Sequence, residues 1–152
     1  MKRRLGSLMI ALSIFAGSPL SLADELLMVR SPLPFAETML ALQDAIREHG
    51  YQLSRVQRVD IGLTASGFET DKYRVVFFGR PQEVHELAVR HPELIPYLPI
   101  KVAIFGEDEE TVLVTLNPGG FRDFYPEPEL GPVFDRWEED LHSMFDRIRG
   151  AD

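Results

Sequence analysis

Two histidines in the middle of the chain raise the question of a zinc site. His85 is followed by Glu86 in a segment with helical periodicity, as in the zinc-binding motif of metalloproteases. That motif needs a second histidine four residues after the first, and position 89 is Val. The next histidine, His91, falls off that helix face. We therefore expect no metal site here, with His91 at a helix end and His85 on the surface.

The short sequence Gly79-Arg80-Pro81 is a second candidate for chemistry. It places a guanidinium group beside the predicted start of a helix, where backbone N–H groups favour an anion. Together with His85 and a carboxylate such as Glu83, Arg80 would serve an enzyme that acts on a small anionic substrate. This hypothesis requires Arg80 and His85 to share a concave pocket. The other interpretation is a strand-to-helix turn whose arginine meets acidic neighbours.

Other patterns exclude whole classes of site. The acidic run 107–110 lacks the alternating ligands and the glycine of a calcium loop, so we expect a solvated hairpin turn. The chain has no cysteine, which excludes disulfides, cysteine-ligated metals and cysteine nucleophiles. It contains neither a nucleophile elbow nor a phosphate-binding loop. We predict no catalytic residue, no metal and no cofactor.

The N-terminal residues have the three-part layout of a secretory signal peptide. Basic residues at positions 2–4 precede an apolar run over residues 8–16, and small residues precede a cut after Ala23. The apolar run is shorter than the roughly 20 residues that span a bilayer. We predict that residues 1–23 are removed, and that residues 24–152 form one periplasmic or secreted domain without a stable membrane anchor.

The net charge of the chain disfavours two classes of binding partner. The chain of 152 residues has a formal charge of −8, and removing residues 1–23, with three basic and no acidic side chains, leaves −11. Nucleic acids and anionic membranes are bound by clustered lysine and arginine. The sequence therefore predicts that neither is a partner.

Hydrophobic periodicity predicts the elements that position these residues. The predicted order is β-α-β-β-α-β-β-α, which indicates an α+β fold with an antiparallel-rich sheet and helices on one face. The first strand is expected at or near the centre of the sheet. The predicted strands cover residues 25–30, 51–63 with a bulge, 72–78, 100–105 and 111–116, and the helices cover 34–49, 81–90 and 132–148. Residues 64–67 are predicted to form a turn, and segments 93–99 and 121–132 are irregular.

The apolar runs 75–78 and 100–105 are the best candidates for the centre of the sheet. We expect Val75 and Phe77 to face the helices, and therefore Val76, Phe78, Ala103, Phe105 and Leu113 to face away from them. Such a semi-apolar outer face needs a cover: the segment 121–132, a second subunit or a ligand. The residues predicted to bind at this face or beside it are Arg74, Val76, Phe78, Arg80, Lys101 and Phe105.

The order of short motifs resembles that of a known family. Phe78-Gly79-x-Pro81 follows an apolar strand, and Leu98-Pro99 precedes a strand that contains Lys-Val. This set, over about residues 25–148, is similar to the prokaryotic domain-of-unknown-function 302 family. The resemblance implies a two-layer α+β sandwich like that of the TATA-box-binding protein, and it brings no established activity or catalytic residues. Arg80 departs from the family, which often has a small polar residue there.

The main hypothesis is an exported, non-catalytic binding domain. It would hold a small ligand or a protein partner, such as a second copy or a periplasmic protein, on its outer sheet face. The alternative is the enzyme with Arg80 and His85. A third hypothesis is a structural accessory of a periplasmic redox or envelope complex.

Overall fold

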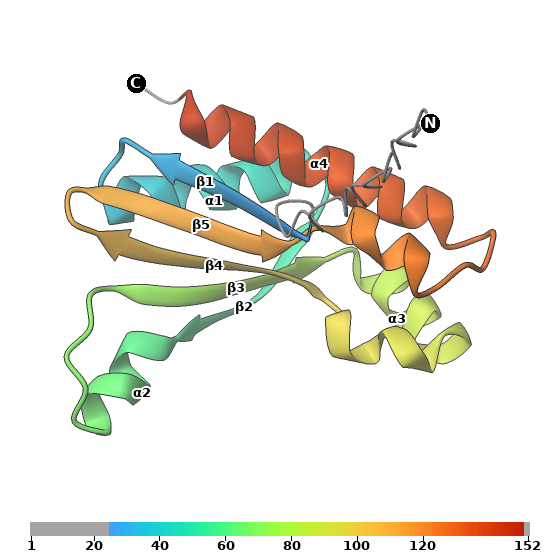
Figure 1. The fold of residues 1–152 in the computed structure, drawn as a ribbon, viewed down its shortest axis with the longest axis horizontal. Coiled ribbons are helices and arrows are strands. Elements are labelled where there is room, and N and C mark those ends of the chain that lie inside the picture. Colours follow the sequence, from blue (N-terminus) through green and yellow to red (C-terminus); the bar gives the residue numbers. More distant parts are fainter. Residues whose placement is uncertain (1–24, 151–152) are drawn as a thin grey trace, which may run out of the picture.

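The computed structural model describes residues 25–150 as one five-stranded sheet with helices against one face (Figure 1). The strands lie in the order β1-β5-β4-β3-β2, and every neighbouring pair is antiparallel. The predicted two-layer α+β sandwich is thereby confirmed. The elements are β1 (Leu26–Ser31), α1 (Phe35–Glu48), β2 (Gln52–Arg58), α2 (Val59–Ala65), β3 (Tyr73–Gly79), α3 (Pro81–Arg90), the 3-10 helix η2 (Pro92–Tyr97), β4 (Ile100–Glu107), β5 (Glu110–Leu116), the 3-10 helix η3 (Pro118–Asp123) and α4 (Gly131–Arg149). The predicted signal peptide, residues 1–23, lies outside the described residues.

Helices α1 and α4 form the second layer because each has one apolar stripe to bury. The predicted stripe of α1 packs as expected, with Leu42 and Ile46 fully buried. In α4 the buried residues are Phe134, Trp137, Leu141, Met144, Phe145 and Ile148, which include all those predicted. The two helices also meet through an ion pair between Arg147 and Glu48. No helix within residues 25–150 is both long enough and apolar enough to cross a membrane.

The predicted phase of β3 is wrong. Val76 and Phe78 face the helices and are fully buried, so Val75 and Phe77 lie on the outer face. Leu113 of β5 is also buried in the core rather than exposed on the outer face. The run 75–78 is apolar at every position, so no alternation fixes its phase, and a shift of one residue exchanges the two faces.

Three local predictions also need correction. Strand β1 lies at the edge of the sheet, not at its centre. The segment 93–99, expected to be irregular, contains most of the 3-10 helix η2. The segment 51–63 is not one bulged strand, because β2 ends at Arg58 and helix α2 follows.

Helix α2 is held to the sheet by an ion pair at its first turn. Asp60 in that turn accepts a hydrogen bond from Arg74 of β3. This hydrogen bond is the main reason that the pKa of Asp60 lies below its usual value. None of the residues of α2 is buried. The helix thus depends on this polar contact and on its neighbours in sequence, which hydrophobic periodicity does not reveal.

The motif at the end of β3 places Gly79 in close contact with two other segments. A Cβ atom on Gly79 would lie 2.7 Å from Val84 Cγ2 of α3 and 3.3 Å from Pro99 Cβ, just before β4. Glycine is therefore needed because the backbone approaches these side chains too closely for any larger residue. The motif residues Gly79 and Pro99, distant in sequence, meet at this point.

Candidate functional site

The face of the sheet opposite α1 and α4 has no helix across its centre (Figure 1). We call it the outer sheet face. Strand register places one residue from each strand in a line across it, which we call the middle row: Gln57, Val75, Ala103, Val114 and Met28. Met28 is 54% exposed, and Val75, Ala103 and Val114 are half-buried. The middle row is thus an apolar strip that borders on solvent.

On one side of the middle row lies a cationic row of Arg55, Phe77 and Lys101. Phe77 is the register partner of both Arg55 and Lys101, so it stands between two basic residues on this face. Neither Arg55 nor Lys101 pairs with a carboxylate in the described part of the chain. The Lys101 ammonium donates instead to the Pro96 carbonyl, at 2.9 Å.

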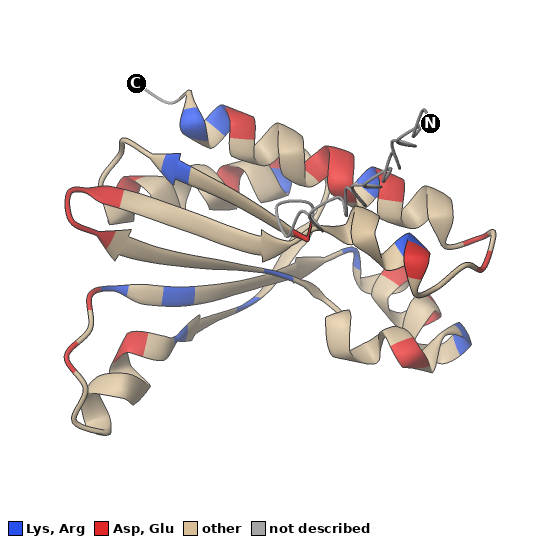
Figure 2. Ribbon diagram, viewed as in Figure 1, with Lys and Arg blue, Asp and Glu red and all other residues tan. Residues whose placement is uncertain are grey.

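These unpaired cations are concentrated in one region. Within residues 25–150, every lysine and arginine side chain outside the segment 55–72, except Lys101, forms an ion pair with a carboxylate. The five strands contain five basic residues but only two acidic ones, Glu107 and Glu110, both next to the β4–β5 turn (Figure 2). The sheet is therefore positively charged in a chain that is strongly acidic as a whole.

On the other side of the middle row lies an aromatic row of Tyr73 and Phe105. Their rings pack with centroids 5.4 Å apart. Both line a cavity of about 310 Å³ that also includes Thr70, Asp71 and Lys72, whose ammonium group lies 5.9 Å from the centroid of the Phe35 ring. Asp71 has no ion-pair partner among residues 25–150. This end of the outer sheet face therefore offers aromatic rings and a free carboxylate.

Of the six predicted site residues, only Lys101 and Phe105 lie on the outer sheet face. Val76 and Phe78 are in the core, as described above. The Arg74 side chain is 13% exposed, pairs with Asp60 and lies 5.7 Å from the centroid of the Phe35 ring, on the helix side. Sequence reasoning did not assign several residues of this face, among them Met28, Arg55, Tyr73, Val75, Phe77 and Val114. The correct phase of β3 and β5 would have placed Tyr73, Val75, Phe77 and Val114 there.

Arg80, the remaining predicted residue, belongs to a structural cluster. Its guanidinium group lies 4.8 Å from the centroid of the Tyr51 ring, donates to the His49 carbonyl and is 3.9 Å from Asp140. Burial, followed by the hydrogen bond to Asp140, raises the pKa of Tyr51. His85 is exposed on α3, and neither Arg80 nor His85 lines any of the four cavities described here. Arg80 and His85 therefore share none of these cavities. The contacts of Arg80 fit the interpretation of a strand-to-helix turn whose arginine meets an acidic neighbour.

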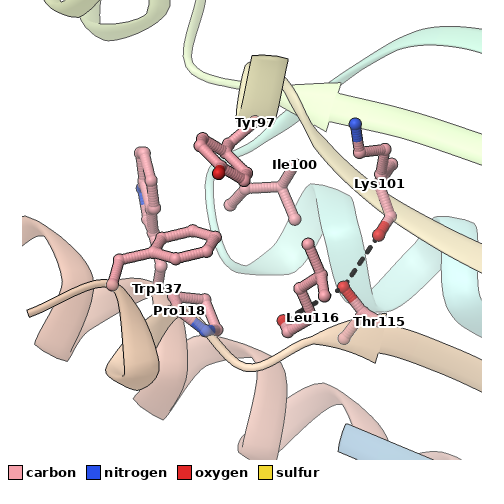
Figure 3. Close-up of a pocket in the computed structure, with 8 residues that line it drawn as sticks. Tyr97, Ile100, Lys101, Thr115, Leu116, Pro118 and Trp137 are labelled. Atoms are coloured by element: carbon pink, nitrogen blue, oxygen red, sulfur yellow. Dashed lines mark hydrogen bonds between the residues drawn. The ribbon is translucent and has the colours of Figure 1, made fainter. Parts of the chain in front are cut away.

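The end of the sheet that carries the cationic row is closed by aromatic side chains. A small cavity of about 20 Å³ lies between β4, β5 and α4, lined in part by Tyr97, Leu116 and Trp137 (Figure 3). Thr115 Oγ1 donates to the Lys101 carbonyl at its edge. The segment 121–132 packs here, through Phe121 and Tyr125, and leaves the middle row uncovered.

A polar cavity of about 140 Å³ lies between α3 and the start of α4. It is lined by His91, which lies at the end of α3 as predicted and is buried, and by Glu129, whose Oε1 is 3.6 Å from His91 Nε2. Its other charged residues include Glu83, which binds Arg136 and the Trp137 indole N–H. No group of three or more potential metal ligands is present among residues 25–150.

Comparison with known proteins identifies the family. Residues 27–148 match the family described as "Domain of unknown function DUF302". The chain belongs to the DUF302 family. A crystal structure of an uncharacterised conserved DUF302 protein from Bacillus stearothermophilus is similar, with a TM-score of 0.72 and 19% identity over 82% of this chain and 98% of that one. No curated protein matches. At this identity the DUF302 structure supports the fold alone.

Proposed function

We propose that this DUF302 chain is a non-catalytic binding domain that works outside the cytoplasm and associates with a second copy of itself through the outer sheet face. The observation that carries the proposal is the arrangement of that face: an uncovered apolar middle row between a cationic row and an aromatic row. The predicted signal peptide, residues 1–23, supports the location.

A protein partner suits this face better than a small ligand. Small molecules are bound in concave sites that enclose most of their surface. None of the four described cavities is lined by a middle-row residue. Two sheets, in contrast, pack face to face about 10 Å apart, with their side chains interdigitated.

The outer sheet face is complementary to itself under a two-fold rotation. An axis along the middle row would reverse the strand direction of the second copy and place each strand above its own counterpart. In β4, Lys101 and Phe105 are equally far from Ala103, so Lys101 of one copy would lie above Phe105 of the other. In β3, Phe77 would lie above Tyr73 in the same way.

Charge favours this arrangement as well. The ammonium group of Lys101 would approach the Phe105 ring and the free carboxylate of Asp71, which line the same cavity. Because the axis is two-fold, the contact would occur twice. Lys101 and Asp71, which form no ion pair within one copy, would then pair with each other across the interface.

Replacing Met28 with glutamate should abolish the association. Met28 lies in the middle row and is 54% exposed, so the variant should fold normally, but each interface would bury two adjacent carboxylates. The control is Leu40→Glu, since Leu40 is 62% exposed on α1, away from the sheet face. Size-exclusion chromatography with light scattering, over a range of concentrations, should report a dimer for the native chain and Leu40→Glu, and a monomer for Met28→Glu. A monomeric native chain, or equal masses for the two variants, would contradict the proposal.

A further inference from the structure

A groove at one end of the sheet has the composition of a binding site for an organic cation. Its volume is about 460 Å³, within the usual range for small-molecule sites. Segments from four parts of the chain line it: Glu25 before β1, the residues after β5, the end of η2 and the segment 121–125. We call it the end groove. It is separate from the middle row of the outer sheet face.

Three aromatic rings in the end groove form one continuous group. The ring centroid of Tyr97 is 4.7 Å from that of Phe121 and 6.1 Å from that of Tyr125. Phe121 and Tyr125 both pack on Phe134, which is fully buried, at 5.5 and 6.5 Å. The rings are therefore fixed from behind by the core. Phe124 adds a fourth ring, 77% exposed, to the lining.

The charged residues that line the end groove are both acidic. Glu25 and Asp123 have no ion-pair partner within residues 25–150, and the lining includes no lysine or arginine. Arg122 is next in sequence, but it is bound to Asp135 and Glu138 of α4. Lys101 lines the small neighbouring cavity, with its ammonium on the Pro96 carbonyl. Negative charge therefore dominates the groove.

The ionisation of Tyr125 is consistent with that negative charge. Its hydrogen bond with Tyr97 has the largest effect and raises the pKa of Tyr125. The carboxylates of Glu93 and Glu127 act in the same direction. They place two further negative charges near the aromatic group.

We propose that the end groove binds a small organic cation with a quaternary ammonium group. Aromatic faces attract such cations through their quadrupole, and the attraction grows when the cation is desolvated. The carboxylates of Glu25 and Asp123 supply the opposite charge. The same carboxylates disfavour an anion, and they would lose solvation without compensation beneath a neutral apolar ligand. An ammonium group is the chemistry that satisfies both the rings and the acids.

Choline titrated into the full-length mature chain tests this site. The chemical shifts of the Gly120 and Phe121 amides, followed by NMR, should change and saturate. The neutral isostere of choline, in which a tert-butyl group replaces trimethylammonium, should bind roughly tenfold more weakly, since it lacks the cation–π and charge terms. Phosphocholine and phosphatidylcholine vesicles should bind more weakly than choline, because their phosphate meets the two carboxylates. Tighter binding of either would assign the site to a lipid headgroup and overturn the free-cation proposal.

Substitutions in the end groove separate the contribution of its carboxylates from that of its aromatic rings. Asp123→Asn combined with Glu25→Gln should weaken choline binding roughly tenfold, and Phe124→Ala should weaken it less, because its ring is only one of four. The control is Glu109→Gln, an exposed acid in the β4–β5 turn at the far end of the sheet, which should bind like the native chain. Equal binding of choline and its isostere, unchanged affinity in the double variant, or no saturable shift with the native chain would each refute the proposal. Met28→Glu should abolish the association but leave the end groove intact. Measuring choline binding with this variant therefore tests the end groove separately from the association through the outer sheet face.

Discussion

Phe78→Ala should lower the free energy of unfolding by about 3–5 kcal/mol. Phe78 is fully buried between β3 and the helices, and its ring meets that of Tyr51 edge-on at 5.6 Å. Removing the ring leaves a cavity that the rigid sheet and α1 cannot close, so both the transfer energy and the packing are lost. Urea denaturation followed by circular dichroism measures the change.

The adjacent residue provides the matched control. Phe77 has the same side chain but lies on the outer sheet face, so Phe77→Ala should lower the free energy of unfolding by only about 1 kcal/mol. Both substitutions are best made in the Met28→Glu variant, because association would add a concentration-dependent term to the stability. A larger loss for Phe77→Ala than for Phe78→Ala would mean that the two faces of β3 are assigned the wrong way round.

Gly79→Ala should lower the free energy of unfolding by about 1–3 kcal/mol, although it adds only a methyl group. That methyl would lie 2.7 Å from Val84 Cγ2, closer than two carbon atoms can approach. Val84 is β-branched and has few rotamers with which to withdraw, and Pro99 blocks the other side. The α3 helix must therefore shift away from β3. Thermal and urea unfolding both report the loss.

Two further variants test this explanation of the glycine. Val84→Ala removes the clashing atom, so the double variant with Gly79→Ala should lose less stability than the sum of the two single variants. Gly120→Ala is the control, since a Cβ atom there meets nothing within 4 Å. If Gly79→Ala proves as harmless as Gly120→Ala, the close approach of β3, α3 and Pro99 is not what requires glycine at this position.

The two helices of the second layer, α1 and α4, were the parts of the fold that the sequence predicted best. The stripe from Phe134 to Ile148 repeats at helical spacing, because α4 has one buried face and one wet face, and all its predicted positions are buried. Antiparallel pairing between 100–105 and 111–116 also followed from the acidic turn between them. The spacing of apolar residues was enough to predict which side of an element is buried wherever only one side is apolar.

The candidate site was predicted less well for the same physical reason. The outer sheet face is itself apolar at its centre, so β3 shows no alternation and its phase could not be read from Val75–Phe78. The outer sheet face has an apolar centre, as predicted. Its residues from β3 are Val75 and Phe77, however, and not the predicted Val76 and Phe78. The end groove depends on Glu25, Tyr97 and Phe121 meeting from distant segments, and no spacing in the sequence encodes that contact.

Exchange of charge between Lys101 and Asp71 tests the proposed interface most directly. Neither residue forms an ion pair within one copy, so reversing either charge breaks no internal ion pair; Lys101→Asp loses the hydrogen bond from the Lys101 ammonium to the Pro96 carbonyl. Sedimentation equilibrium should show that Lys101→Asp and Asp71→Lys each raise the dimer dissociation constant roughly tenfold, and that the double variant recovers most of the loss. A double variant that is as weak as the product of the two single effects would show that these residues do not meet across a two-fold axis, and would contradict the face-to-face pairing of the sheets.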